Sequence, residues 1–195
     1  HWKTTLERAI DLLPPHISMY ALTLDGGTPM EHSVDVGKLP TPDADLAADM
    51  YAMAEEAFDD QGYRHYEISN WAIEARESRH NLVYWRNQPY LGVGPGAHSY
   101  LKNHRFANLK PPREYIRLLG LAPSPSKGEG WGEGDAAVVI RSVPVVDSVE
   151  LIDATLEMAE TMMLGLRLDE GISVEQFHTR FGASPLDIYA RIFDD

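Results

Sequence analysis

The 195-residue sequence contains no cysteine. Disulfide bonds, thiolate zinc sites and cysteine-ligated iron–sulfur clusters therefore cannot be built from residues of this chain. Long apolar runs are also missing, since no stretch approaches the roughly 20 residues of a membrane-spanning helix. The N-terminal residues lack the charged and then apolar layout of a signal peptide. Together these absences predict a cytoplasmic protein with no membrane span.

Positive charge is scarce as well. The sequence has 30 Asp and Glu residues against 17 Lys and Arg residues, which gives a formal net charge of −13. A surface that binds nucleic acid needs clustered Lys and Arg to contact phosphates, and the basic residues here are scattered. The composition therefore predicts no nucleic-acid partner. An apolar fraction of 44% is nevertheless typical of a folded, globular chain.

The first part of the chain alternates between helical and strand-like patterns. Apolar residues at helical spacing predict a helix over residues 2–13, and residues 16–22 have the composition of a strand. A second helix is expected after a cap at Asp43 or Asp45, followed by a strand over residues 63–68. This order predicts an α/β fold in which parallel strands are joined by helical crossovers.

Composition divides the chain into three predicted parts. Residues 1–119 hold the α/β pattern, which ends in a short strand and a proline-initiated helix. Residues 120–147 contain the near-repeat GEGWGEG and many Ser, Pro and Lys residues, which predicts a flexible low-complexity insertion. Residues 148–195 are predicted to be helical, with caps at Ser148 and Ser173. Their acidic character favours a packing module over a DNA-reading helix-turn-helix.

Polar and aromatic side chains are concentrated between residues 62 and 101. Three of the eight histidines, His65, His80 and His98, lie here among several tyrosines and tryptophans. Burying a polar group without a hydrogen bond costs about 1–3 kcal/mol, so such a segment forms either a ligand site or a very polar core. We interpret it as a site. The spacing of the histidines matches no common metal-binding pattern, and no metal site is predicted within the chain.

Polar residues also occur on the two predicted strands. In the segment YEISN, which ends at Asn70, Glu67 and Ser69 lie on one side of the second strand, and Tyr66 and Ile68 lie on the other. On the first strand, Ser18 and Tyr20 alternate with apolar residues. If the strands are parallel, these side chains face the crevice at the carboxyl ends of the strands, where ligands commonly bind. Glu67 has a second interpretation, as an anchor for the loop that follows it. Both interpretations remain open from the sequence.

Two further features lie between residues 80 and 99. In GVGPGAHS, glycines at alternate positions, including Gly94 and Gly96, would let backbone N–H groups approach an anion, or would allow tight packing where a strand begins. Helical spacing places His80 and Tyr84 on one face, and Asn81 lies next to His80. His80 can contact a ligand or act as a hydrogen-bonded structural residue.

Five blocks of sequence, in this order along the chain, resemble those of a known family: SMYALTLDGGTP, GYRHYEISNWA, SRHNLVYWRNQPYLGVGPGAHSYL, RFAN and AETMMLGLRLDEGI. The chain resembles the oxygen-independent coproporphyrinogen III oxidase-like (HemN/HemW) family. Within it, the blocks are most similar to the HemW branch, radical S-adenosylmethionine proteins regarded as haem chaperones. The resemblance covers residues 1–119 and 148 to about 190, and the HNLVYW and GVGPGAHSY blocks are its most specific parts.

The resemblance implies a fold and a set of cofactors. The chain would be the C-terminal part of a partial (β/α)6 radical S-adenosylmethionine barrel, followed by a truncated, helical, winged-helix-like C-terminal domain. In the family, S-adenosylmethionine and a [4Fe–4S] cluster lie at the C-terminal face of the barrel, and a CxxxCxxC motif near the N-terminus binds the cluster. That motif is absent from this sequence, so the cluster ligands would lie outside this chain.

Several residues acquire roles through the resemblance. Tyr20, Ala21 and His98 match positions where family members approach the cofactor. True oxidases usually have an aliphatic residue at the position of His98, which favours the HemW side. Because the HemW branch binds haem, His80 and His98 become candidate haem contacts. The predicted cofactor-binding set comprises Tyr20, Ala21, Glu67, Asn70, His80, Asn81, Gly94, Gly96 and His98.

Three functions are consistent with the sequence. The first is a haem chaperone of the HemW type, with haem-acceptor proteins as partners. The second is an oxygen-independent coproporphyrinogen III oxidase, which decarboxylates porphyrinogen propionates that Arg79, Arg86 and Arg105 could bind. The third is a binding module without catalytic activity. Because the cluster-binding cysteines are absent, the chain alone is expected to be inactive as a radical enzyme.

Overall fold

The structure of the chain is a computed structural model that describes residues 1–121 and 140–193. Residues 122–139, the greater part of the predicted insertion, lie outside the described residues. The expected flexibility of the insertion therefore stays a prediction, and so does the three-part division of the chain.

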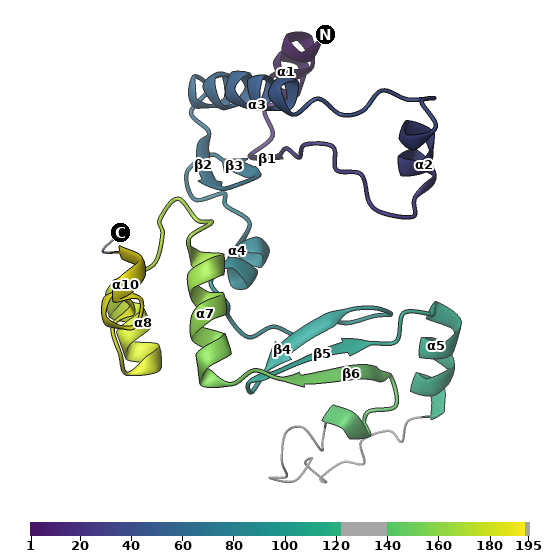
Figure 1. Cartoon of the computed structure of the whole chain (residues 1–195), viewed down its shortest axis with the longest axis vertical. Helices are drawn as coiled ribbons and strands as arrows, with labels where there is room; N and C mark the ends of the chain where they lie inside the picture. The colour runs from purple at the N-terminus through teal and green to yellow at the C-terminus, as the bar shows by residue number, and fades with distance from the viewer. Residues whose placement is uncertain (122–139, 194–195) are drawn as a thin grey trace. The chain divides into compact units, whose positions relative to one another are not determined.

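The described residues form two compact units, which are drawn in Figure 1. The first unit comprises His1–Arg79 together with Arg167–Glu170. The second comprises His80–Leu166 together with Gly171–Asp195. The helices and strands of the first unit are α1 (Trp2–Asp11), β1 (His16–Ser18), α2 (Pro29–Asp35), α3 (Ala44–Asp59), β2 (Arg64–Glu67) and β3 (Asn70–Ala72).

The helices of the first unit begin at residues with capping chemistry. The Asp43 carboxylate accepts a 3.0 Å hydrogen bond from the Leu46 N–H at the start of α3, which confirms one of the two predicted caps. Helix α2 was not expected from the sequence. Thr28 caps it by accepting a 3.3 Å hydrogen bond from the Glu31 N–H, and Pro29 occupies its first turn.

The sheet of the first unit has the strand order β1-β3-β2, and both strand pairs are antiparallel. The sequence predicted parallel strands with helical crossovers, and it did not predict the antiparallel strand that separates them in this sheet. The chain reverses at Ile68 and Ser69, directly after β2, so that β3 returns between β2 and β1. Strands β1 and β2 still run in the same direction, because each is antiparallel to β3. The described residues form no closed barrel.

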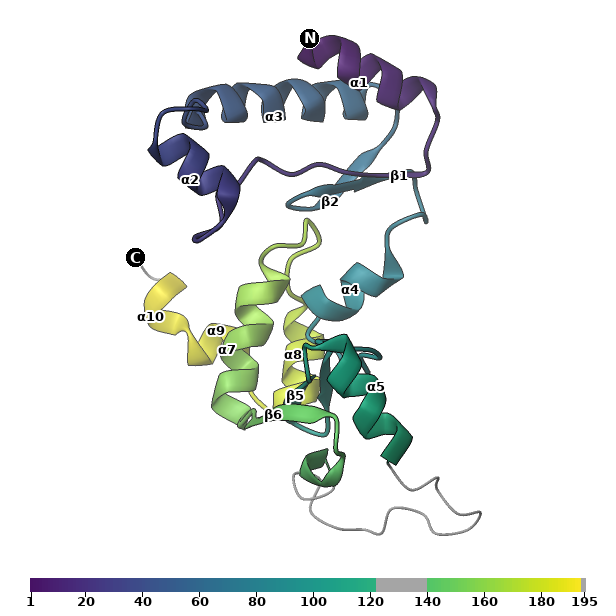
Figure 2. The same cartoon turned by 90° about the vertical axis from the view of Figure 1, so that its right-hand side faces the viewer.

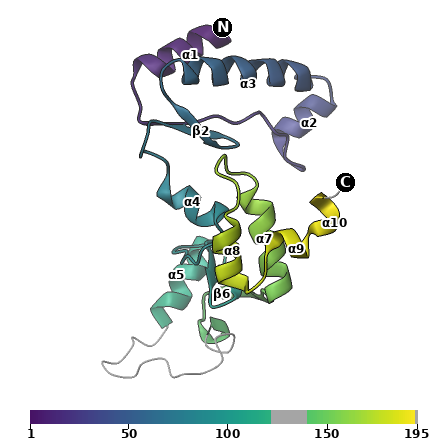
Figure 3. The same cartoon turned by 90° about the vertical axis from the view of Figure 1, so that its left-hand side faces the viewer.

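Aromatic side chains dominate the core of the first unit. Trp71 on β3 is 1% exposed, and its ring contacts those of Phe58 and Tyr51 at centroid distances of 5.4 and 5.5 Å. The Trp2 indole N–H donates a 2.8 Å hydrogen bond to the Met50 carbonyl, which ties α1 to α3. Figure 2 shows α1 alongside α3, and Figure 3 shows the pair from the opposite side. The buried core residues are Leu6, Ala54, Phe58, Tyr63 and Trp71.

The second unit contains an antiparallel sheet with the strand order β4-β5-β6. The strand predicted around RFAN is confirmed as β5, and the proline-initiated helix is confirmed as α5. The described elements of this unit are α4 (Arg79–Trp85), β4 (His98–Leu101), β5 (His104–Asn108), α5 (Pro112–Leu121), β6 (Val146–Leu151), α7 (Ala154–Gly165), α8 (Val174–Phe181), α9 (Pro185–Ile188) and α10 (Ala190–Phe193).

Strand β6 occupies the place where a helix was predicted to begin. Ser148 lies within this strand, paired with β5, so the expectation of a helix capped at Ser148 was wrong. The β-branched Val146 and Val149 favour a strand, but the apolar spacing that follows them also fits a helix. Helix α7 begins later, where the Asp153 carboxylate accepts a 2.8 Å hydrogen bond from the Leu156 N–H.

The C-terminal helices follow the predicted capping signals. The Ser173 hydroxyl accepts a 3.2 Å hydrogen bond from the Gln176 N–H at the start of α8. Gly182 ends α8 in the left-handed region, with φ at 74°, and Ser184 and Pro185 begin α9. Within the described ranges, no helix is both long and apolar enough to cross a membrane.

Candidate functional site

A buried polar cluster lies on the sheet of the first unit. Glu67 and Asn70 are each 2% exposed, and the Asn70 amide N–H donates to one Glu67 carboxylate oxygen. The Ser18 hydroxyl donates to the side-chain amide oxygen Oδ1 of Asn70, and the Ser69 N–H donates to the second Glu67 oxygen at 3.4 Å. Glu67 therefore holds the turn between β2 and β3, as its interpretation as an anchor requires. Ser18, which was expected to face the same crevice as Glu67, therefore lies in this cluster through its bond to Asn70.

Burial sets the electrostatics of this cluster. It raises the pKa of the Glu67 carboxyl above 4.5, because the carboxylate form loses contact with water. The Ser69 N–H and the positive potential of His65, His16 and Arg167 act in the opposite direction and only reduce that rise. The folded chain consequently holds a proton on Glu67 at a pH where the unfolded chain has released it.

This difference in proton binding predicts how stability depends on pH. The contribution of Glu67 to the free energy of unfolding is fully present below about pH 4.5 and is lost as the pH rises through the folded pKa. We expect the free energy of unfolding of the wild type, relative to Glu67→Gln, to fall with rising pH over that interval. Urea unfolding at a series of pH values measures this difference. The exposed Glu74→Gln variant is the matched control, and parallel curves for wild type and Glu67→Gln would contradict the prediction.

Sequence reasoning missed two residues beside this cluster, His16 and Tyr66. The His16 Nε2 atom and the Tyr66 hydroxyl oxygen are 2.8 Å apart, and the Ser78 N–H donates to the same hydroxyl at 3.3 Å. These bonds tie the segment after β3 to the sheet. The sequence carried a weak signal, since His16 and Tyr66 lie on the same two predicted strands as the polar residues that were chosen. By contrast, Tyr20 is 72% exposed and lies beyond the end of β1.

His65, the first of the three histidines in the polar–aromatic segment, is part of the packing. Its ring stacks on Trp71 at a centroid distance of 4.5 Å with an interplanar angle of 19°. The Tyr51 hydroxyl lies 3.1 Å from His65 Nε2 and donates a 2.8 Å hydrogen bond to the Ile68 carbonyl. Burial, with Glu55 and Glu67 nearby, raises the pKa of the Tyr51 hydroxyl. His65 thus acts as a structural residue of the first unit.

In the second unit, α4 carries an exposed histidine–tyrosine pair. His80 Nε2 lies 3.1 Å from the Tyr84 hydroxyl, and the two rings meet edge-on at 4.9 Å, which confirms the predicted shared face. Tyr84 in turn meets the ring of Tyr90 edge-on at 4.6 Å. Tyr90 and Tyr100 exchange backbone hydrogen bonds of 2.8 and 2.9 Å, which connects this ring contact to β4. Asn81, beside His80, is half-buried.

The glycine-rich segment packs tightly before β4. Three of its N–H groups donate within the chain: Gly92 to the Ser99 hydroxyl at 2.9 Å, Gly94 to the Tyr115 hydroxyl at 3.3 Å, and Gly96 to the Leu109 carbonyl at 2.9 Å. These bonds favour the packing interpretation of the glycines over anion binding by free N–H groups. The contribution of Gly94 and Gly96 to a cofactor site stays a prediction. His98 follows at the start of β4 and is exposed.

Gly92 offers a direct test of the packing interpretation. A Cβ atom at this position would lie 2.1 Å from the His98 carbonyl oxygen, which belongs to backbone and cannot rotate away. We expect Gly92→Ala to lower the free energy of unfolding by about 1–3 kcal/mol. Gly120→Ala is the matched control, because a Cβ there has no atom within 4 Å and alanine favours the helix α5. Chemical denaturation that finds Gly92→Ala as stable as wild type would contradict the packing interpretation.

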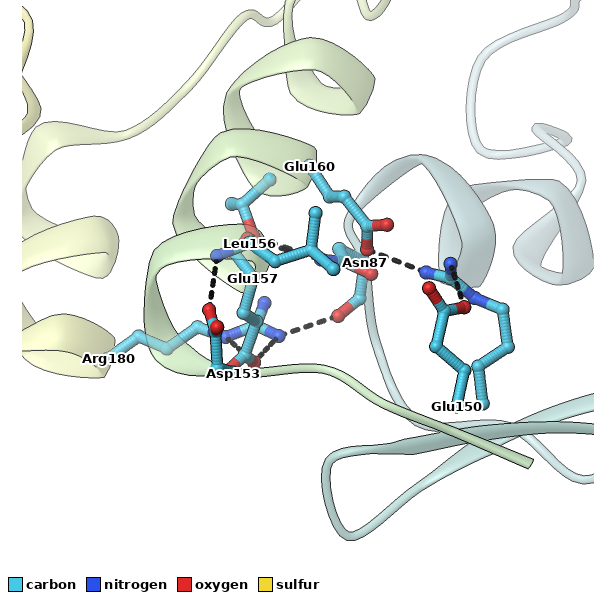
Figure 4. A network of polar contacts seen from close by, with 9 residues as sticks. Asn87, Glu150, Asp153, Leu156, Glu157, Glu160 and Arg180 are labelled. Carbon is cyan, nitrogen blue, oxygen red and sulfur yellow. Dashed lines mark hydrogen bonds and ion pairs between the residues drawn. The ribbon is translucent and has the colours of Figure 1, made fainter.

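Polar contacts join the turn after α4, the sheet and the C-terminal helices of the second unit (Figure 4). Arg105 on β5 donates to the Glu160 carboxylate at 2.6 Å and to the Glu150 carboxylate at 3.4 Å. The hydrogen bond to Glu160 is the main reason that the pKa of the Arg105 guanidinium is raised. Arg105, one of three arginines considered for binding propionates, therefore already has carboxylate partners in this fold.

The nine predicted site residues are divided between the two units. The first unit contains Tyr20, Ala21, Glu67 and Asn70, of which Glu67 and Asn70 are in direct contact. The second contains the remaining five, His80, Asn81, Gly94, Gly96 and His98. Their convergence at one ligand site stays a prediction. Among the described residues, no group of three or more His, Asp and Glu side chains is arranged to hold a metal ion.

Comparison with known proteins shows which family the chain resembles in sequence. Residues 152–192 match the sequence profile of the HemN C-terminal domain family. The chain is 32% identical over 187 residues to the haem chaperone HemW of Lactococcus lactis, an alignment that covers 96% of this chain and 44% of the relative. It is 31% identical over 195 residues to HemW of Bacillus subtilis, covering 100% of this chain and 46% of the relative.

One further relative and one solved structure agree with these matches. The mitochondrial radical S-adenosyl methionine domain-containing protein 1 of Mus musculus is 44% identical over 181 residues, which cover 88% of this chain and 36% of that protein. The coproporphyrinogen III oxidase HemN of Escherichia coli, a radical SAM enzyme, has a similar fold, with a TM-score of 0.63 at 13% identity over 97% of this chain and 42% of that chain. The chain spans less than half the length of the curated relatives that it matches. With these matches along almost all of its residues, the chain belongs to the HemN/HemW family.

Proposed function

We propose that the protein containing this chain is a haem chaperone of the HemW type. The observation that carries the proposal is the 32% identity to the Lactococcus lactis haem chaperone over 96% of this chain. The geometry adds support, because His80 and His98 are both exposed and both belong to the second unit. An exposed imidazole nitrogen is a ready ligand for iron.

His80 and His98 are the candidate haem contacts in this proposal. Haem also presents a broad apolar face. A protein that binds haem therefore needs solvent-exposed apolar side chains that can contact this face. Leu91 and Val93, in the segment between α4 and β4, are 67% and 84% exposed and have this chemistry. Haem is here the cargo of the protein, to be passed to haem-acceptor proteins.

The residues that contact the family cofactors, S-adenosylmethionine and the [4Fe–4S] cluster, are assigned less specifically than the haem contacts. S-adenosylmethionine is proposed to contact the predicted residues of the first unit, Tyr20, Ala21, Glu67 and Asn70. Asn81, Gly94 and Gly96 stay predicted cofactor contacts of the second unit. The sequence has no cysteine to ligate a [4Fe–4S] cluster, so its ligands would be supplied by residues outside this chain. The predicted cytoplasmic location stays a prediction.

An oxygen-independent coproporphyrinogen III oxidase is the alternative function. Such an enzyme would need cations for substrate propionates. Arg105 is already paired with Glu160 and Glu150, which weighs against one of the three arginines considered for that role. A non-catalytic binding module is the third function, and a CxxxCxxC motif elsewhere in the complete protein would argue against it.

Purified complete protein, reconstituted with iron and sulfide, separates these functions. We expect it to bind haem with a shifted Soret band, to transfer haem to an acceptor protein, and to leave coproporphyrinogen III unchanged. Decarboxylation of coproporphyrinogen III without haem binding would establish the oxidase instead. If protein that carries the cluster neither binds haem nor decarboxylates coproporphyrinogen III, the result would favour the binding module.

A further inference from the structure

Helix α4, which carries the candidate haem contact His80, is too short to be stable alone. It has seven residues, Arg79–Trp85. Isolated helices of fewer than about 12 residues are marginal in water. Its last carbonyl groups are bonded by the residues that follow it, since the N–H groups of Arg86, Asn87 and Gln88 donate to carbonyls of α4. The orientation of His80 therefore depends on what holds the C-terminal end of α4.

Arg180, on α8, supplies donors directly after that end. Its guanidinium donates to the Asn87 carbonyl at 2.8 Å and lies 3.4 Å from the Arg86 carbonyl oxygen. Positive charge at the C-terminal end of a helix is also favoured by the helix dipole. Arg180 thus acts as a cap on the turn at Arg86 and Asn87 that directly follows α4, from 93 positions further along the chain.

The Arg180 guanidinium is itself held in place. Glu157 on α7 accepts a 3.1 Å hydrogen bond from Arg180 Nε and a second bond from Nη2. The Arg180 guanidinium carbon also lies 5.1 Å from the centre of the Phe181 ring. Figure 4 shows Arg180 reaching both Glu157 and Asn87. Two helices of the matched HemN C-terminal domain therefore contribute to the cap.

Asn87 completes the connection from the other side. It is 5% exposed and adopts a positive φ of 48°, which reverses the chain after α4. Its amide donates to the Thr161 hydroxyl at 3.1 Å, and that hydroxyl donates to the Glu157 carbonyl at 2.7 Å. The turn after α4 is therefore bonded through both its backbone and its side chain to α7 and α8.

We propose that Arg180 is a positioning residue that sets the geometry of His80 and Tyr84 by capping the turn after α4 from the C-terminal domain. The proposal rests on the proposed function, since it takes His80 as a haem contact. It adds that haem affinity depends on a residue of α8 that need not touch haem. Hydrogen exchange tests the cap without haem, and haem titration tests its consequence.

The experiment uses the complete protein with Arg180→Ala, Arg180→Lys and, as matched control, the exposed Arg113→Ala on α5. Exchange is followed at the amides of Arg86, Asn87 and Gln88, which bond to carbonyls of α4. We expect Arg180→Ala to exchange about tenfold faster there and to weaken haem binding about tenfold, because charge-assisted bonds are lost. Lysine keeps the charge but not the forked geometry, so Arg180→Lys should fall in between.

The possible outcomes separate the cap from the proposed function. Unchanged exchange in Arg180→Ala overturns the proposal, whatever haem does. Faster exchange with unchanged haem affinity also overturns it, because the cap would then not position the haem contact. If the wild-type protein does not bind haem, the proposed function is contradicted. The exchange result would still show whether Arg180 acts as the cap. If Arg180→Ala does not fold, Arg180→Lys and Glu157→Gln give the same comparison.

Discussion

Replacing Trp71 by alanine is expected to lower the free energy of unfolding of the first unit by about 3–5 kcal/mol. The side chain is 1% exposed and packs against three rings, those of Tyr51, Phe58 and His65. Alanine would remove this contact surface and leave a cavity between α3 and the sheet. No other single substitution in the first unit removes so many aromatic contacts among the described residues.

Trp71→Phe sharpens this test. The Trp71 indole N–H is buried without a hydrogen-bond partner in the described part of the chain, so phenylalanine removes an unsatisfied donor while keeping a ring. We therefore expect Trp71→Phe to cost clearly less than Trp71→Ala. Equilibrium unfolding in urea, followed by circular dichroism, measures both, with Leu12→Ala as a control because Leu12 is 82% exposed. Equal stabilities for Trp71→Ala and Leu12→Ala would refute this account of the core.

The second large effect is expected at the buried polar cluster. Asn70→Leu removes the amide that donates to Glu67 and the oxygen that accepts from Ser18. Leaving a buried hydrogen-bonding group without its partner costs about 1–3 kcal/mol, and more when that group is charged. We expect a loss of that size near neutral pH. The loss should shrink at low pH, where Glu67 is protonated and carries no charge.

A double-mutant cycle isolates this interaction. Glu67→Leu combined with Asn70→Leu removes both polar groups, so the double variant should be more stable than the sum of the two single losses predicts. Urea unfolding of the four proteins gives the coupling free energy. Additive losses would mean that Glu67 and Asn70 do not depend on each other and would contradict the geometry of the cluster.

Features with local signals were predictable from the sequence. Ser173, Gly182 and Ser184 set the ends of α8 and α9 through bonds within one helical turn, and each was correctly identified. The contact of His80 with Tyr84 is local in the same sense, since four positions separate them. The polar residues on the strands were also identified, because Glu67 and Asn70 stand out from the apolar pattern around them.

Features that depend on distant partners were not predictable. Strand β3 has three residues, and its position between β1 and β2 depends on pairing with residues more than 50 positions away. The sequence around Val146 and Val149 fits a strand or a helix, and pairing with β5 decides between them. Nothing local marks Arg180 as the partner of Asn87, which lies 93 positions earlier. Alternation of helices and strands indicated an α/β fold but did not reveal that the chain reverses after β2.

Haem titration of the complete protein and its histidine variants tests the central claim most directly. The wild type should bind haem with a shifted Soret band, and His80→Ala or His98→Ala should weaken binding at least about tenfold while circular dichroism remains unchanged. His178→Ala, an exposed histidine on α8, is the matched control and should bind as the wild type does. Unaltered haem binding in the His80→Ala, His98→Ala double variant would contradict the assignment of haem to this segment of the chain.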